Sequence, residues 1–89
     1  MEIKFKDFEI RPVIRTDNTI KYDVVKWQKD EGKPYCFSIA FITYNKKEEA
    51  CEFRSIGKRY LEYREDGLEE WIMAFMNLIE VKKRGESYE

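Results

Sequence analysis

Six large apolar residues recur at helical spacing near the end of the chain. They stand at i, i+3, i+4, i+7, i+8 and i+11: Leu68, Trp71, Ile72, Phe75, Met76 and Ile79. This spacing predicts a helix over residues 66–84 with one broad apolar stripe, capped at its start by Asp66 and ended by Gly85. Burying six such side chains is worth on the order of 10 kcal/mol before conformational entropy is subtracted, so the stripe must pack on another layer.

That other layer is predicted to be a sheet, because residues 1–64 alternate between short apolar-rich segments and turns. Apolar and charged residues alternate over 3–10 with a change of phase at Asp7, as a bulge requires, and at Pro12 this strand is expected to end or to lie at an edge. Further strands are expected at 20–27, 35–44 and 50–56, with a fifth strand or an extended connector at 60–63. The fold class is therefore a single α+β domain: a four- or five-stranded, mainly antiparallel sheet (1–64), a C-terminal helix on one face (66–84) and a tail (85–89).

Loop lengths predict the register of the sheet. A three-residue loop at 45–47 pairs Phe41 with Cys51, and a loop at 29–32 pairs Val24 with Phe37. The face that this register gives to the helix carries Ile20, Tyr22, Val24, Phe37, Ile39, Phe41, Cys51 and Phe53. The opposite face carries Val25, Trp27, Cys36, Ala40, Ile42, Tyr44 and, in one alternative, Ile56. The two cysteines then lie on opposite faces, beyond disulfide reach, and are expected to be reduced, partly buried thiols.

A single helix cannot cover both faces of such a sheet. The second apolar face is therefore covered by the N-terminal strand, paired in a homodimer, offered to another partner, or left as a tolerated patch. Because Trp and Tyr are frequent anchors of protein interfaces, the predicted partner-binding residues are Trp27, Ile42, Tyr44 and Val25.

Composition excludes several kinds of chemistry. With no histidine and two cysteines, the chain cannot build a Ser-His-Asp or Cys-His nucleophile system, an imidazole zinc site or a tetrathiolate zinc site. Its paired carboxylates fall in turns or on the polar side of the helix, where water screens them. No catalytic, cofactor-binding or metal site and no small-molecule substrate is therefore predicted, and the protein is not expected to be an enzyme.

Charge and hydropathy bound the location and the partners. The chain has 17 Lys and Arg against 18 Asp and Glu, a net charge of −1, with the signs mixed along its length. This balance gives no general attraction to nucleic acid or to an anionic membrane. No apolar run approaches the roughly 18 residues that a membrane span needs, and the first residues lack the layout of a secretory signal. A cytoplasmic protein is expected.

Basic and aromatic residues are interleaved just before the predicted helix, at Lys58, Arg59, Tyr60, Tyr63 and Arg64. An edge strand that leads into a helix cap is the favoured interpretation of this stretch. The alternative is a secondary polar or nucleic-acid site of Lys58, Arg59, Tyr60 and Arg64, in which the arginines meet phosphates while Tyr60 or Tyr63 stacks on a base.

The order of antiparallel strands followed by one helix resembles the Whirly and positive-cofactor class of single-strand DNA binders over about Ile20 to Val81. The sequence GKRYLEYREDGLEEW occupies the passage from the last strand to the helix in that class, and the resemblance implies a dimer with a curved sheet. The aromatic-rich, charge-dense composition, with KWQKDEGKPYCFSIAF, also resembles small uncharacterised proteins encoded by phages and prophages of low-GC Gram-positive bacteria. Many of these bind and disable a host system, including nuclease inhibitors of the anti-CRISPR kind.

The sequence therefore predicts a non-catalytic binding protein of phage or mobile-element type, whose partner is a protein. The alternative is a dimeric protein that binds single-stranded DNA or RNA.

Overall fold

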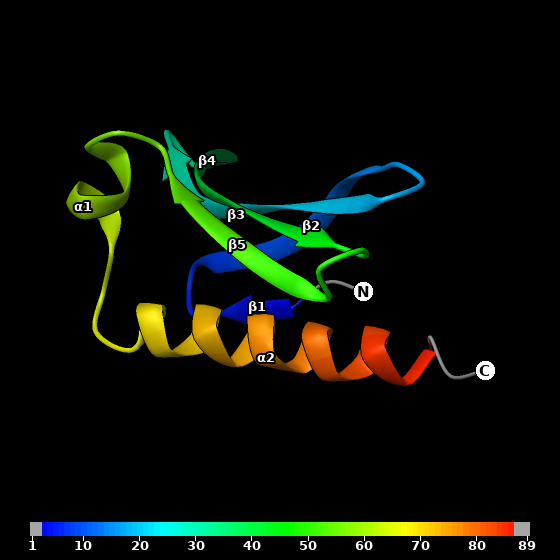
Figure 1. Cartoon of the computed structure of the whole chain (residues 1–89). Coiled ribbons are helices and arrows are strands. Elements are labelled where there is room, and N and C mark those ends of the chain that lie inside the picture. The colour runs from blue at the N-terminus through cyan, green and yellow to red at the C-terminus, as the bar shows by residue number, and fades with distance from the viewer. Residues whose placement is uncertain (1–2, 87–89) are drawn as a thin grey trace.

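The computed structural model describes residues 3–86, which form five strands followed by two helices. The strands are β1 (Ile3–Phe5), β2 (Phe8–Arg15), β3 (Thr19–Asp30), β4 (Lys33–Asn45) and β5 (Ala50–Ser55), and the helices are α1 (Arg59–Tyr63) and α2 (Leu68–Glu86). Neighbouring strands pair antiparallel in the order β1-β2-β3-β4-β5. The sheet is strongly twisted, and α2 lies along one of its faces (Figure 1). The predicted α+β class, with an antiparallel sheet and a C-terminal helix, is confirmed.

The strands are joined by turns whose lengths differ from those expected. The chain reverses at Lys6 and Asp7, where a bulge was predicted, so that β1 and β2 form a hairpin. Glu31 and Gly32 alone connect β3 to β4, and both have positive φ, as a two-residue type I′ turn requires. The connection from β4 to β5 runs over residues 46–49. Since each turn length sets the pairing of its two strands, the predicted register is wrong.

A β-bulge in β4 decides which of its residues reach the helix. Val25 pairs with Ser38, but its neighbour Val24 pairs with Ala40, so Ile39 is an extra residue in β4. In such a bulge two consecutive side chains oppose one residue of the partner strand. Ile39 and Ala40 are accordingly both fully buried. Up to Ile39 the odd-numbered residues of β4 face the core, and from Ala40 on the even-numbered ones do.

Beyond the bulge, the even-numbered residues of β4 face α2. Ile42 pairs with Tyr22 and Tyr44 with Ile20, and both Ile42 and Tyr44 belong to the core. The prediction that Ala40, Ile42 and Tyr44 face outward is therefore wrong, and so is the prediction that Phe41 faces the helix. Phe41 lies on the outer face, where the Nζ atom of Lys21 is 4.1 Å from the centroid of its ring.

The core is a single layer between the sheet and α2. Its buried members come from β2, β3, β4, α1 and α2: Phe8, Ile10, Ile20, Tyr22, Val24, Ile39, Ala40, Ile42, Tyr44, Tyr60, Leu68, Ile72, Phe75 and Ile79. Aromatic rings meet edge to face within it, as where Tyr22 and Phe75 lie with their centroids 5.1 Å apart. The predicted helical stripe is thus core. Phe8 and Ile10 also belong to this layer, so the hypothesis that the N-terminal strand covers the outer face is wrong.

Both helices differ in detail from the prediction. Residues 59–63 form the short helix α1 and not a strand or an extended connector. Tyr60 and Tyr63 are three positions apart, which places them on the same side of a helix, where Tyr60 packs on Phe53 and Tyr63 on Phe37. The helix α2 begins at Leu68, after Gly67 with φ 88°, and continues through Gly85, which was expected to end it. Of the predicted tail 85–89, residues 87–89 lie outside the described part of the chain.

Alanine substitutions at positions 41 and 42 test which residues of β4 face the core after the bulge. Ile42→Ala is expected to lower the free energy of unfolding by about 2–5 kcal/mol, because it removes a fully buried side chain from the core. Phe41→Ala is expected to cost about 1 kcal/mol, since its ring lies partly exposed on the outer face. Urea unfolding followed by circular dichroism measures both. A larger loss for Phe41→Ala than for Ile42→Ala would contradict the register.

Candidate binding surface

The four predicted partner-binding residues do not lie together on one exposed surface. Trp27 is on the outer face with 37% of its surface exposed, whereas Ile42 and Tyr44 are 0% and 1% exposed and lie beneath α2. Val25 is on the outer face but is also buried. Ile42, Tyr44 and Val25 therefore cannot be contacted by a partner of the folded chain, and the prediction that they form a docking surface is wrong.

Hydrogen-bonded polar side chains, and not a second helix, cover much of the outer face of the sheet. The Ser38 hydroxyl donates to Oδ2 of Asp23 at 2.8 Å, and Nη2 of Arg11 donates to the sulfur of Cys36 at 3.5 Å. Arg11 and Asp23 are paired directly across β2 and β3. These residues surround Val25, which explains why an apolar side chain on this face is out of contact with water.

Trp27 is held rigidly despite its exposure. Its indole N–H donates to Oε1 of Glu9 at 2.8 Å, and its backbone N–H donates to the carbonyl of Asp7 at 2.8 Å. Glu9 is itself buried, so this carboxylate on the neighbouring strand β2 fixes the orientation of the ring. An exposed aromatic ring that is already ordered loses little conformational entropy when a partner binds.

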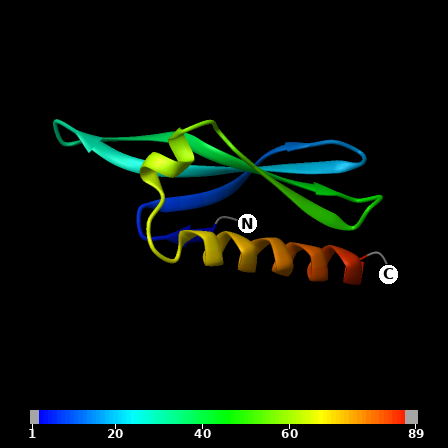
Figure 2. The same ribbon diagram turned by 60° about the vertical axis from the view of Figure 1, so that its left-hand side comes forward.

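A hollow of about 450 Å³ lies beside Trp27, where β3 and β4 extend past the end of β2. The residues lining it are Asp7, Lys26, Trp27, Gln28, Lys29 and Pro34. Trp27 and Pro34 share the outer face, because their partners across the ladder are Cys36 and Lys29. We call the residues Trp27, Gln28, Lys29 and Pro34 the Trp27 surface. Figure 2 shows the β3–β4 hairpin that carries it projecting beyond α1 and the first turn of α2.

A partly enclosed lysine fixes the base of this hairpin. Nζ of Lys26 lies 3.6 Å from Oδ2 of Asp7, 3.5 Å from Oε1 of Glu65 and 4.7 Å from the centroid of the Phe8 ring. Only 10% of the Lys26 side chain is exposed, so these contacts are less screened than a surface ion pair. They connect the β1–β2 turn to the segment before α2. Tyr22, Val24 and Lys26 alternate on the helix side of β3, but the strand pattern did not predict that a lysine would be enclosed there.

The basic and aromatic stretch before α2 does not form a single surface. Tyr60 is buried and cannot stack on a base, which corrects that part of the prediction. Lys58, Arg59 and Arg64 are exposed, but Arg64 lines a hollow with the carboxylates of Glu65, Asp66, Glu69 and Glu70. These carboxylates oppose the binding of a phosphate there.

Arg59 instead joins a row of aromatic rings on the inner face of the hairpin. The centroids of Tyr35 and Phe37 are 6.2 Å apart, and those of Phe37 and Tyr63 are 4.8 Å apart. The Arg59 guanidinium lies 5.6 Å from the Phe37 ring and donates to the Ser38 carbonyl. Tyr35, Phe37 and Tyr63 are called the aromatic row below. The sequence alone did not predict this row, because Tyr63 meets Phe37 only through the contact between α1 and β4.

The titratable groups of the described chain offer little reactive chemistry. No three of its Cys, Asp and Glu side chains are grouped so that they could hold a metal ion. Burial, and secondarily the negative charge of Glu80, raises the pKa of the Cys51 thiol to about 11. Its backbone N–H donates to the Glu80 carboxylate and its thiol to the Met76 carbonyl. Burial is also the main cause that raises the pKa of Tyr60.

Over residues 3–86, none of the helices has the length and apolar character needed to span a bilayer. Comparisons with protein-family models, with curated proteins and with solved structures give no match. The candidate surfaces must therefore be judged on their own geometry.

The two cysteines are expected to differ in reactivity. Both are free thiols, but at pH 8 a pKa of about 11 leaves Cys51 with roughly a hundredth of the thiolate that its ordinary pKa would give. Iodoacetamide should therefore alkylate Cys36 well before Cys51, and peptide mass spectrometry would report the order. Equal rates in the folded protein, with the same reaction in urea as the control, would contradict the described environment of Cys51.

Proposed function

We propose that this protein is a non-catalytic binding protein that recognises a partner protein through the Trp27 surface. The observation that carries the proposal is Trp27 itself. This residue is 37% exposed, its ring is fixed by the buried Glu9, and it stands beside a hollow at the base of a projecting hairpin. Tryptophans that fill or border pockets are among the residues that contribute most to protein interfaces.

The charges around Trp27 favour a protein over a nucleic acid or a membrane. Lys29 is exposed at the hollow, but Lys26 is paired with Asp7, which lines the same hollow. A phosphate backbone needs several unpaired cations in one place. A mixed apolar and polar surface of this kind is instead typical of protein interfaces.

The proposal includes a phage or mobile-element origin and an inhibitory action on a host defence system. Its support is the resemblance in composition over most of the chain; the segment quoted for it, residues 26–41, contains both Trp27 and Pro34. A small protein without catalytic groups can inhibit a larger one by covering the surface that the larger one needs. A second copy of this chain is a further partner that the same surface could bind.

Substitutions at the Trp27 surface test the proposal. Trp27→Ala is expected to weaken partner binding about thirtyfold or more, the effect of losing a central interface tryptophan. Because this change also removes a donor from the buried Glu9, Pro34→Glu is the decisive variant: it introduces a charge beside Trp27 and leaves the Trp27–Glu9 hydrogen bond in place. Met73→Glu, at an exposed apolar position of α2, is the matched control and should bind normally.

Binding is measured by affinity capture from a bacterial lysate with and without nuclease, and self-association by sedimentation velocity. The expected result is a protein retained after nuclease treatment by the unaltered chain and by Met73→Glu, and lost with Pro34→Glu. If retention depends on nucleic acid, or is the same for Pro34→Glu and the unaltered chain, the proposal is wrong.

Single-stranded nucleic acid is a second candidate, favoured by the aromatic row and Arg59. Tyr35 is exposed at the end of the row, and stacking of a base on such a ring is worth about 1–3 kcal/mol. Titration with labelled oligonucleotides at 50 and 200 mM salt should then show binding that falls with salt. Tyr35→Ala or Arg59→Ala would weaken it about tenfold, whereas Lys46→Ala, in the β4–β5 turn, would not. An absence of binding at the lower salt concentration would eliminate this candidate.

A further inference from the structure

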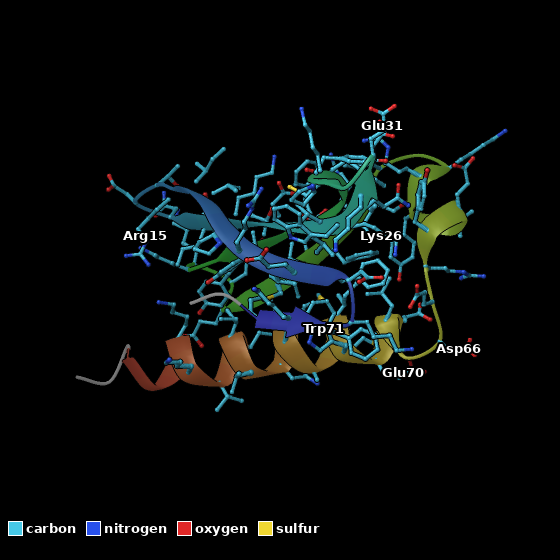
Figure 3. All side chains as sticks on the ribbon, turned by 180° about the vertical axis from the view of Figure 1, so that it is seen from behind. Arg15, Lys26, Glu31, Asp66, Glu70 and Trp71 are labelled. Carbon is cyan, nitrogen blue, oxygen red and sulfur yellow. The ribbon has the colours of Figure 1, made fainter. Side chains whose placement is uncertain are left out.

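The layer between sheet and helix is open at the end of the molecule that lies away from the β3–β4 turn. The strand β1 pairs only with Phe8–Ile10 of β2. From Arg11 to Arg15, no described residue pairs with β2 on that side. Figure 3 shows Trp71 beneath β1, and Arg15 at the far end of the sheet above the C-terminal half of α2.

Side chains along one side of α2 differ in how far they are exposed. Trp71 stacks on Phe5 of β1 with ring centroids 5.4 Å apart. Leu78 follows Trp71 by seven residues, two turns along the same side of α2. It is 48% exposed. An exposed apolar side chain thus lies on the same side of α2 as Trp71 and Phe75.

A cleft of about 180 Å³ occupies this open end, between β2, β3 and α2. Its apolar and aromatic floor is formed by Pro12, Tyr22, Phe75 and Ile79. A cavity of about 150 Å³ is known to hold a benzene ring, so one apolar side chain of that size fits.

The charged residues described at the rim of the cleft are all cations. Arg15 comes from β2, Lys82 and Lys83 come from α2, and none of the described residues that line the cleft is acidic. Arg15 and Lys82 are exposed and stand on opposite walls. Several cations around an apolar floor are complementary to carboxylates that flank an apolar side chain.

We propose that this cleft binds an extended acidic segment of a partner protein. One apolar side chain of the segment enters the cleft, carboxylates on either side of it meet Arg15 and Lys82, and the backbone passes over Leu78. Pro12 has no N–H to offer, and the register shifts between Pro12 and Ile14, so a continuous ladder cannot form along this edge. Side-chain contacts therefore provide the specificity. This site is separate from the Trp27 surface, since no residue lines both the cleft and the hollow beside Trp27.

Selection from a random peptide library displayed on phage tests the proposal, because it reports the preferred peptide chemistry even when the partner is unidentified. The unaltered chain is immobilised, and the enriched peptides are synthesised with a fluorescent label for binding measurements by anisotropy. The expected peptides carry Asp or Glu on both sides of one apolar residue. Arg15→Glu/Lys82→Glu and Leu78→Glu should each weaken their binding about tenfold or more.

Two controls separate this site from a general effect of charge and from the Trp27 surface. Lys29→Glu/Lys33→Glu makes the same change of net charge on the β3–β4 hairpin, and Trp27→Ala removes the anchor of the other surface. Both should bind the enriched peptides as the unaltered chain does. If Arg15→Glu/Lys82→Glu lowers the thermal unfolding midpoint, Arg15→Gln/Lys82→Gln replaces it, with an expected loss of about threefold.

The outcome that would overturn the proposal is equally specific. Enriched peptides without acidic residues, or acidic peptides that bind the Arg15→Glu/Lys82→Glu variant within twofold of the unaltered chain, would show that the cleft is not an acidic-peptide site. Displacement of the peptide by single-stranded oligonucleotide, with tighter binding of the oligonucleotide, would assign the cleft to nucleic acid and would also refute it. Neither outcome bears on the Trp27 surface.

Discussion

The bulge at Ile39 determines how one helix can be enough for this sheet. A strictly alternating β4 would divide its apolar residues between two faces, and one of those faces would need a second layer. By adding one residue opposite Val24, the bulge brings Ile39, Ala40, Ile42 and Tyr44 to the same side. The apparent excess of apolar surface disappears, and the outer face is left to polar contacts such as those of Glu9 and Asp23.

This arrangement moves the candidate binding surfaces from the middle of the sheet to its two ends. In the middle, α2 covers one face and hydrogen-bonded polar side chains close much of the other. At one end, β3 and β4 extend past β2 near Trp27, and at the other, no described residue pairs with the edge of β2 that lies away from β3 between Arg11 and Arg15. Each end thus has a strand edge without a partner among the described residues. The hollow beside Trp27 and the cleft beside Arg15 lie at these edges.

Local patterns predicted β3, β4, β5 and α2, but not the turn between β1 and β2, the helix α1 or the pairing of the strands. The stripe of α2 was readable because six apolar residues at fixed helical spacing have no competing explanation. The strands were readable from alternation, but the register depended on the turns, and Glu31-Gly32 lacks the Asn-Gly or Asp-Gly signature of a two-residue turn. A bulge without glycine, such as that at Ile39, leaves no mark in the sequence. Of the four predicted interface residues, Trp27 and Val25 were placed on the outer face by the alternation of β3 and not by that register, and of these two only Trp27 is exposed.

The buried polar groups explain why Trp27 can be both exposed and ordered. A Trp on a projecting hairpin would ordinarily be free to change its rotamer, and fixing it on binding would cost free energy. Here Glu9 holds the indole N–H, and Lys26 holds the β1–β2 turn whose Asp7 carbonyl receives the Trp27 backbone N–H. Burying Glu9 and Lys26 costs desolvation energy that an apolar pair at the same positions would avoid. That cost is consistent with positions shaped by the need to orient Trp27 in addition to the need for stability.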